Sequence, residues 1–220
     1  MSGYEAVLER IAQAAHRAGR RPEEVTLLVV SKGQSLEAIR SVYNKGHRLF
    51  GENRVQELLA KKPHLPQDIQ WHLIGHLQTN KVKAILPHIV LLHSLDRESL
   101  LAEITKRAET PVPCLIEVKV AQEPTKHGIV PAALDAFVEK VLETPKVQLR
   151  GLMGMASLTT DSEQVRREFR QLYKLFVKLR ERYPHAAIDT LSMGMSGDFE
   201  IAVEEGSTLV RVGSAIFGAY

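Results

Sequence analysis

The sequence of 220 residues predicts an α/β fold in which eight strand–helix units close into a single (β/α)8 TIM barrel spanning residues 1–220. Eight short apolar segments alternate with longer segments of helical period, which is the order expected of β/α units. The strand-like segments are almost continuously apolar, as in parallel sheets that are covered on both faces. No low-complexity linker divides the chain, and its length is close to that of one such barrel.

The expected strands each run from an apolar body to a polar or glycine-containing end. In chain order they are 25–31, 48–52, 69–75, 89–95, 112–120, 149–155, 189–195 and 208–214. An open, doubly wound sheet is the alternative arrangement. It would place a glycine-rich phosphate-binding turn after the first strand, and the sequence SKGQS at that point lacks the G-x-G-x-x-G pattern of such a turn.

Helices are expected between the strands, at 35–46, 55–62, 80–86, 97–109, 134–143, 164–183 and 199–206. The clearest is 164–183, whose apolar stripe consists of Val165, Phe169, Leu172, Phe176, Leu179 and Tyr183. The opening segment also carries apolar residues on one side, namely Val7, Leu8, Ile11 and Ala15. Since it precedes the first strand, we expect an extra N-terminal helix that packs outside the ring.

The composition argues against several classes of partner. The net charge of +3 is spread along the chain and aromatic residues make up 5% of it, whereas nucleic-acid-binding surfaces concentrate basic and stacking residues. No apolar run approaches the roughly 20 residues of a membrane span, and the N-terminal segment lacks the apolar core of a signal peptide. We therefore expect a cytoplasmic protein that contacts neither nucleic acid nor membrane. Its single cysteine, Cys114, is expected to be a small buried residue of a strand.

Lys32 stands directly after the apolar segment VTLLVVS, at the end where barrel strands deliver residues to a common mouth. Most strand-end lysines are simply solvated. An amine drawn partly into a barrel mouth, however, has its charged form disfavoured by desolvation and by neighbouring cations such as Arg211. The neutral amine is a nucleophile toward aldehydes, and the commonest use of such a lysine is a Schiff base with pyridoxal phosphate (PLP).

This cofactor requires a phosphate site, and the last two expected strands end in suitable sequences. Ser196-Gly197 precedes the helix expected at 199–206, so that free backbone N–H groups would face an anion. Gly213-Ser214 follows the last strand and presents no bulky side chain. Either sequence alone is equally consistent with a helix cap and a turn, but barrels frequently bind phosphate with these two loops.

Arg211 lies on the last strand, two residues before Gly213, and is expected to point into the barrel beneath the phosphate. One interpretation is an internal ion pair with a carboxylate. The other is a hydrogen bond to the pyridine nitrogen of the cofactor, which a donor that keeps its proton would leave unprotonated. The ring would then be a poor electron sink, so transamination and elimination are not expected.

Seven stretches spread over nearly the whole sequence resemble the pyridoxal phosphate homeostasis protein family: VVSKGQ, FGENRVQE, WHLIGHLQTNK, HSLDR, TKHGI, RGLMGM and LSMGMSGDFEIAVEEGSTLVRVGSAIFG. The resemblance implies a barrel related to the N-terminal domain of alanine racemase, with PLP bound as an imine to Lys32. It further implies a site formed by Asn53 facing the cofactor, Ser196, Gly213 and Ser214 at the phosphate, and Arg211 at the ring nitrogen. Met195, at the end of the seventh expected strand, is a candidate to flank the cofactor ring, and the alternative is a methionine that only fills the barrel. Family members usually follow the lysine with a Thr-Lys-Pro-like turn, whereas this sequence has Gly33-Gln34-Ser35.

The histidines suggest no metal site. His72 and His76 in HLIGH have the four-residue spacing of a helical metal site, but the first is expected on a strand and a glycine interrupts the run. No third ligand stands nearby in the sequence, so we expect no metal. The remaining candidates, His64, His88 and His93, are interpreted as ordinary surface or loop residues. Walker loops, G-x-S-x-G elbows and C-x-x-C pairs are absent from the sequence.

Three functions are consistent with these features of the sequence. The resemblance implies a carrier that buffers PLP and delivers it to apo-enzymes without catalytic residues of its own, and a monomer is the simplest expectation. The alternative is an amino-acid racemase. In alanine racemase a tyrosine from a separate domain opposes the lysine, and little sequence follows the last βα unit here, so Tyr43 and His72 are the internal substitutes; Tyr43 is expected on the exterior. The third is a barrel that has lost its cofactor and serves only as an interaction module.

Overall fold

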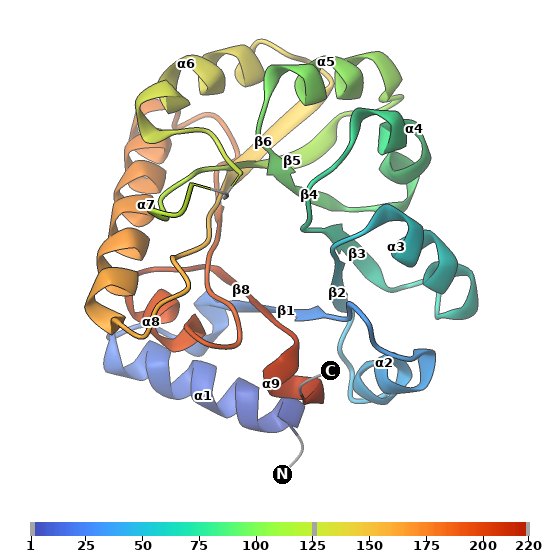
Figure 1. Cartoon of the computed structure of the whole chain (residues 1–220), viewed down its shortest axis with the longest axis vertical. Coiled ribbons are helices and arrows are strands. Elements are labelled where there is room, and N and C mark those ends of the chain that lie inside the picture. Colours follow the sequence, from blue (N-terminus) through green and yellow to red (C-terminus); the bar gives the residue numbers. More distant parts are fainter. Residues whose placement is uncertain (1–2, 125–126, 219–220) are drawn as a thin grey trace.

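The computed structural model describes residues 3–124 and 127–218, and its eight parallel strands form a closed barrel in sequence order (Figure 1). The predicted fold is therefore confirmed. The strands are β1 Thr26–Val30, β2 Leu49–Glu52, β3 Gln70–Leu73, β4 Leu91–Leu95, β5 Val112–Glu117, β6 Val147–Met153, β7 Thr190–Ser192 and β8 Leu209–Val212. Closure comes from β1 pairing with β8, in the register Thr26 to Leu209. Thr125-Lys126 of the TKHGI stretch and both ends of the expected 1–220 domain lie outside the described residues.

Helices follow the strands and cover the outside of the barrel (Figure 1). They are α1 Gly3–Arg17, α2 Leu36–Tyr43, α3 Val55–Lys61, α4 Val82–Ile85, α5 Glu98–Arg107, α6 Pro131–Leu142, α7 Ser162–Arg182, α8 Phe199–Glu204 and α9 Ser214–Phe217. Short 3-10 helices are η1 Pro22–Glu24, η2 Lys62–His64, η3 Thr79–Lys81 and η4 Leu86–His88. Two differences from the sequence prediction are informative. Helix α6 begins three residues early because Pro131 suits a first helical position, and α9 is an unexpected single turn after β8.

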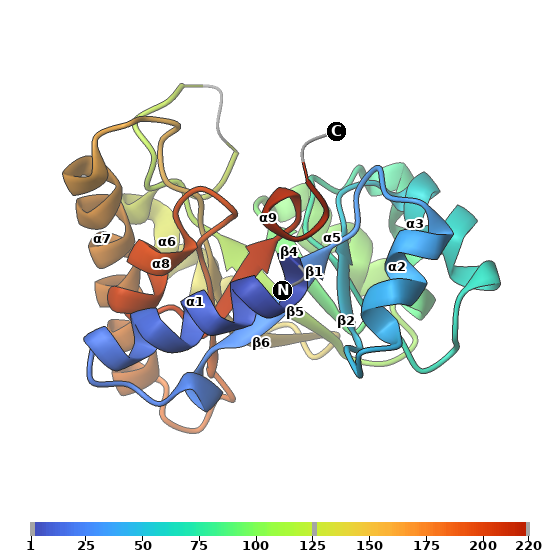
Figure 2. The same cartoon turned by 90° about the horizontal axis from the view of Figure 1, so that it is seen from below.

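Helix α1 is the expected extra element, and it lies outside the ring against α8 and α9 (Figure 1 and Figure 2). Val7, Ile11 and Ala15 are buried in this contact, as predicted. Leu8 differs, because it is 40% exposed and sits at the margin of the buried stripe. None of the described helices is both long and apolar enough to cross a bilayer.

The core has two parts. Most buried apolar side chains pack between the strands and the surrounding helices, and Leu172 and Phe176 of α7 are among them at 0% and 1% exposure. Burying a side chain of this size contributes about 1.5–3 kcal/mol. A smaller cluster joins Leu91, Leu115 and Met153 of neighbouring strands. Several other buried residues of the strands are polar, and some of these lie near the barrel mouth.

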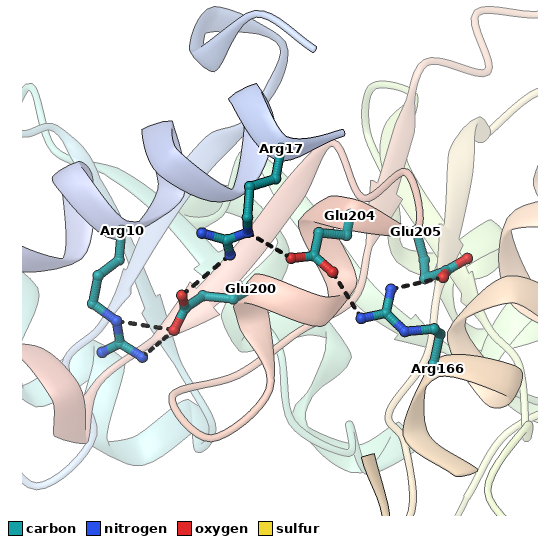
Figure 3. A network of polar contacts seen from close by, with 6 residues as sticks. All are labelled: Arg10, Arg17, Arg166, Glu200, Glu204 and Glu205. Atoms are coloured by element: carbon teal, nitrogen blue, oxygen red, sulfur yellow. Dashed lines mark hydrogen bonds and ion pairs between the residues drawn. The ribbon is translucent and has the colours of Figure 1, made fainter. Parts of the chain in front are cut away.

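Helix α8 is tied to the two helices beside it by a network of ion pairs (Figure 3). Arginines of α1 reach the α8 carboxylates of Glu200 and Glu204 at 2.6 and 3.0 Å. An arginine of α7 shares Glu204 at 2.7 Å and also reaches Glu205 at 3.0 Å. A single exposed ion pair contributes little to stability, but these pairs share partners and so form a network. Its members are Arg10, Arg17, Arg166, Glu200, Glu204 and Glu205. The network holds α8 in place directly after the Ser196-Gly197 loop.

Candidate functional site

All seven residues predicted to form the site line one cavity of about 240 Å³ at the carboxyl ends of the strands. They are Lys32, Asn53, Met195, Ser196, Arg211, Gly213 and Ser214. Val30, Ile74 and Gly197 complete the lining. Because the carboxyl ends of parallel barrel strands converge, residues from opposite ends of the sequence meet here.

Lys32 follows β1 at the rim of the cavity, and the residue is exposed. This differs from the expectation that the amine would be drawn partly out of solvent. The backbone on either side of Lys32 is held firmly instead. The Ser31 carbonyl accepts from Lys61 Nζ at 2.7 Å, and the Gly33 N–H donates to Glu57 Oε1 at 2.6 Å.

These contacts belong to a buried charge network that the sequence analysis missed. Glu52 is fully buried at the end of β2, and its Oε1 accepts from Ser31 Oγ at 2.7 Å and from Lys61 Nζ at 2.8 Å. Lys61 also reaches Glu57 at 2.7 Å. Among the described residues, nothing hydrogen-bonds Glu52 Oε2. Burial raises the pKa of Glu52, although the hydrogen bonds from Lys61 and Ser31 oppose that shift.

Gly33, where this sequence departs from the usual family sequence after the lysine, forms a left-handed turn. Its φ of +71° lies in the left-handed region, which costs glycine little and other residues more. The turn continues with the Gln34 N–H donating to the Ser31 carbonyl, and Ser35 then caps α2 by accepting from the Ala38 N–H at 3.1 Å. The first loop is therefore a hydrogen-bonded turn.

Asn53 is positioned by close packing of the loops after β2 and β3. A Cβ atom on Gly75 would lie 2.1 Å from the Asn53 carbonyl oxygen, so only glycine allows the two backbones to approach. Ser94 Oγ donates to the Gly75 carbonyl at 2.7 Å and fixes this loop from the next strand. The glycine of the HLIGH run thus serves the cavity wall.

Ser196 joins the two loops that were predicted to hold phosphate. Its hydroxyl oxygen accepts from the Gly213 N–H at 3.3 Å and from the Ala215 N–H at 3.2 Å, at the start of α9. The alternative in which Ser196 is only a helix cap does not hold for α8, because the N-cap of α8 is Asp198. Asp198 Oδ1 accepts from the Met195 N–H of the preceding loop at 2.7 Å, and the side chain makes no capping hydrogen bond to α8. The amides that meet the Ser196 hydroxyl therefore lie at the start of α9.

Arg211 forms a buried wall of the cavity and is 3% exposed. Its guanidinium donates to Ser192 Oγ at 2.6 Å and to the Gly154 carbonyl at 3.2 Å. Burial lowers the pKa of Arg211 to about 10, while the charges of Asp198 and Glu117 act in the opposite direction. Arg211 consequently remains a cation at neutral pH.

The structure corrects the interpretation of His93 as a surface or loop residue. His93 lies on β4 and is fully buried, with Nδ1 at 2.9 Å from Ser192 Oγ and Nε2 at 2.8 Å from His72 Nδ1. His93 falls within the segment 89–95 that was itself expected to be a strand, but the sequence alone does not show which strand positions meet polar partners inside the barrel. Burial lowers the pKa of His72 to about 4 and that of His93 well below its usual range. Both imidazoles are therefore neutral at pH 7.

This burial predicts a pH dependence of stability. The unfolded chain binds a proton at His72 below pH 6.5, whereas the folded chain does so only near pH 4, so acidification across this window favours unfolding. The shift corresponds to about 3 kcal/mol. In urea unfolding at a series of pH values, His72→Gln should lose about that much of the fall in unfolding free energy between pH 7 and 4. The exposed-site control His64→Gln should keep it, and equal pH profiles for the chain and His72→Gln would contradict the prediction.

The other sequence candidates lie away from the cavity. The Tyr43 hydroxyl donates to Asp68 at 2.6 Å on the outer side of α2, as its expected exterior position implies. Cys114 is fully buried on β5, as predicted, and burial raises the pKa of its thiol. His72 points to His93, while His76 lies beside Asp96, so the two histidines of HLIGH diverge.

Comparisons with known proteins agree with this geometry. Residues 4–220 match the family described as alanine racemase, N-terminal domain. The pyridoxal phosphate homeostasis protein of Aquifex aeolicus is 48% identical over 216 residues, covering 96% of this chain and 94% of the relative. The solved structure of Synechococcus elongatus PipY with PLP bound has a TM-score of 0.82 at 36% identity, covering 94% of this chain and 100% of PipY. Alanine racemase of Corynebacterium glutamicum, at 12% identity, shares the fold with a TM-score of 0.73 over 98% of this chain and 61% of its own.

Proposed function

The chain belongs to the family of pyridoxal phosphate homeostasis proteins, and on that premise we propose that residues 1–220 form one PLP-binding domain that stores the cofactor and releases it to apo-enzymes in the cytoplasm. The observation that carries the proposal is the single cavity lined by all seven predicted residues. PLP bound to the related PipY supports the same ligand here. We propose further that the protein acts as a monomer and without a catalytic role.

The residues present fit the chemical groups of PLP. The cofactor supplies an aldehyde that condenses reversibly with a primary amine, and Lys32 provides that amine at the rim. The Ser196 and Ser214 hydroxyls would donate to the phosphate. The N–H groups of Gly213 and Ala215, which donate to Ser196 Oγ, would position the first of these hydroxyls. Arg211 would donate to the ring nitrogen and keep it unprotonated, since its guanidinium retains its own proton.

The lining of the cavity favours storage over catalysis. Racemisation requires an acid/base group on each face of the substrate. Apart from the cationic Arg211, Lys32 is the only described lining residue that exchanges protons. The internal substitutes lie elsewhere: Tyr43 is bonded to Asp68 on the exterior, and His72 is buried against His93. We therefore propose a carrier in preference to a racemase.

Two assays test this function on the full-length holo-protein. Mixing it with a stoichiometric amount of an apo-aminotransferase should restore transaminase activity as PLP is handed over. Incubation with each L-amino acid in deuterated water should give no sustained turnover to the D-isomer and no progressive α-deuteration. Failure to reactivate any apo-enzyme would contradict the carrier role, and multiple racemisation turnovers that vanish in His72→Ala would establish the racemase instead.

The proposed phosphate contacts predict the effect of Ser196→Ala. The substitution removes one hydroxyl next to a dianion, and a hydrogen bond to a charged group contributes about 1.5–3 kcal/mol. PLP affinity in a spectroscopic titration of the apo-protein should fall by roughly ten- to a hundredfold. Ser162→Ala, at an exposed serine of α7, is the matched control and should leave affinity unchanged. Equal affinities in all three proteins would show that Ser196 only joins the two loops.

A further inference from the structure

A second group of ligand-type side chains lies at the mouth of the barrel, outside the seven-residue cavity. It consists of His76 after β3, Asp96 after β4 and His127 after β5. One candidate ligand atom from each residue lies within 4.8 Å of the other two. His76 Nδ1 is 3.6 Å from Asp96 Oδ2, and the rings of His76 and His127 stack with centroids 4.6 Å apart at an interplanar angle of 26°. Three loops that are distant in sequence therefore converge on one point.

Asp96 is the fixed member of this group. Its side chain is 4% exposed, and its Oδ1 accepts from Arg97 Nη1 at 2.6 Å. Arg97 is itself held by donating to the Leu77 carbonyl at 2.5 Å. This arrangement orients the carboxylate and directs its other oxygen, Oδ2, toward His76. An outer partner that orients a carboxylate in this way is typical of metal-binding sites.

His127 is placed by backbone pairing directly after it. The Ile129 N–H donates to the Glu117 carbonyl at 2.8 Å, and the Lys119 N–H donates to the Ile129 carbonyl at 2.9 Å. These bonds extend β5 and bring His127 back over the barrel mouth. His76 is held from the other side, because Ser94 fixes the Gly75 carbonyl that precedes it.

We propose that His76, Asp96 and His127 bind a divalent transition-metal ion of the zinc class. Two imidazoles and one carboxylate suit Zn²⁺, Co²⁺ or Ni²⁺, and three protein ligands leave coordination positions open to water or an anion. Bonds of about 2.0–2.2 Å around a tetrahedral ion separate the ligand atoms by about 3.4 Å. The carboxylate and His76 are already near that spacing, and the exposed rings of His76 and His127 can close the remainder by side-chain rotation. The sequence spacing of His72 and His76 gave no such indication, because the ligands come from three different loops.

This site is independent of the proposed PLP function, although the two are neighbours. His76 also lines a groove of about 450 Å³ together with Asn53, Arg54, Gln78 and Lys81. Asn53 lines the seven-residue cavity as well, so the groove and the cavity share a wall. A metal ion at this point would clip together the loops after β3, β4 and β5 beside the cofactor site.

The test is a Zn²⁺ titration of the full-length chain, freed of PLP, in competition with a chromophoric chelator. One Zn²⁺ per chain should bind. Co²⁺ in its place should give the visible absorption typical of a tetrahedral ion with nitrogen and oxygen ligands. His76→Ala, His127→Ala and Asp96→Asn should each weaken binding by more than the roughly 10- to 100-fold cost of losing a partner that only orients a ligand. The controls His64→Ala, at an exposed histidine of η2, and Lys32→Ala should bind as the unchanged chain does.

Circular dichroism of each variant establishes that the barrel is folded, and the two exposed histidines allow the test even if Asp96→Asn is unstable. Unchanged Zn²⁺ affinity in both His76→Ala and His127→Ala would overturn the proposal. So would an equal loss in His64→Ala, because binding would then reflect scattered surface histidines. Since the readout uses Zn²⁺ and Co²⁺ alone, its failure leaves the PLP proposal untouched.

Discussion

Lys32→Ala is expected to abolish covalent attachment of PLP completely. The substitution removes the only amine among the described residues that line the cavity, so no other lining group can condense with the aldehyde. The visible absorption band of the holo-protein should disappear, and borohydride reduction followed by peptide mapping should find no modified peptide. The fold should persist, because Lys32 is exposed and Ser31 and Gly33 are anchored through their backbones.

Lys81→Ala is the matched control, since Lys81 lines the adjoining groove rather than the cavity. It should retain the band and the reduced adduct on Lys32. An adduct found on Lys81 or Lys119 in the unchanged chain, with Lys32 unmodified, would refute the assignment. Residual non-covalent binding by Lys32→Ala is compatible with it, because the hydroxyl donors of Ser196 and Ser214 remain.

Lys61→Met is expected to produce the largest loss of stability of any substitution near the site. It leaves the Glu52 carboxylate buried without its cation, and breaking a buried ion pair on one side costs about 3–5 kcal/mol. Because the pKa of Glu52 is already raised by burial and would rise further, Glu52 can protonate at low pH. A group whose folded pKa is raised stabilises the fold below that pKa and loses this contribution as pH rises. The deficit should therefore be smaller near pH 5 than at pH 7 in denaturant unfolding.

Two further variants separate this mechanism from simple loss of packing. Lys83→Met, at an exposed position of α4, should change the free energy of unfolding little. The double variant Lys61→Met/Glu52→Gln should recover much of the loss, because it removes the unpaired charge. If the double variant is as unstable as Lys61→Met at both pH values, the buried carboxylate is not the cause.

The fold could be predicted because its signals are local. Continuous apolar strands, the stripe of α7 and the turn sequences between them are each visible over ten to twenty residues, about the scale on which periodicity is read. Helix α9 was not predicted because a single helical turn after Gly213 is too short to show a hydrophobic period. Its absence from the prediction had a consequence, since the amides that meet Ser196 come from α9 and not from α8.

The candidate site was predictable where a residue follows a strand end, as Lys32, Asn53 and Gly213 do. The buried polar contacts beneath the cavity could not be predicted. His93, Ser192 and Arg211 come from different strands, and only the barrel's register brings them into contact. Lys61 and Glu57 carried a partial signal, because an acidic and a basic residue four apart share a helix face, but their buried partner Glu52 lies on another element.

The row of buried polar groups beneath the cavity also has a direction. A guanidinium can only donate, so the Ser192 oxygen accepts from Arg211, and its buried hydroxyl finds its acceptor at His93 Nδ1. The His93 proton then lies on Nε2 and is donated to His72 Nδ1. Every dipole in the row points away from Arg211, and a proton moving that way would pass from a group with a pKa of about 10 to one of about 4. The positive charge at the cavity wall is therefore that of the Arg211 guanidinium alone, and the row of polar groups beneath it supplies the cavity with no proton.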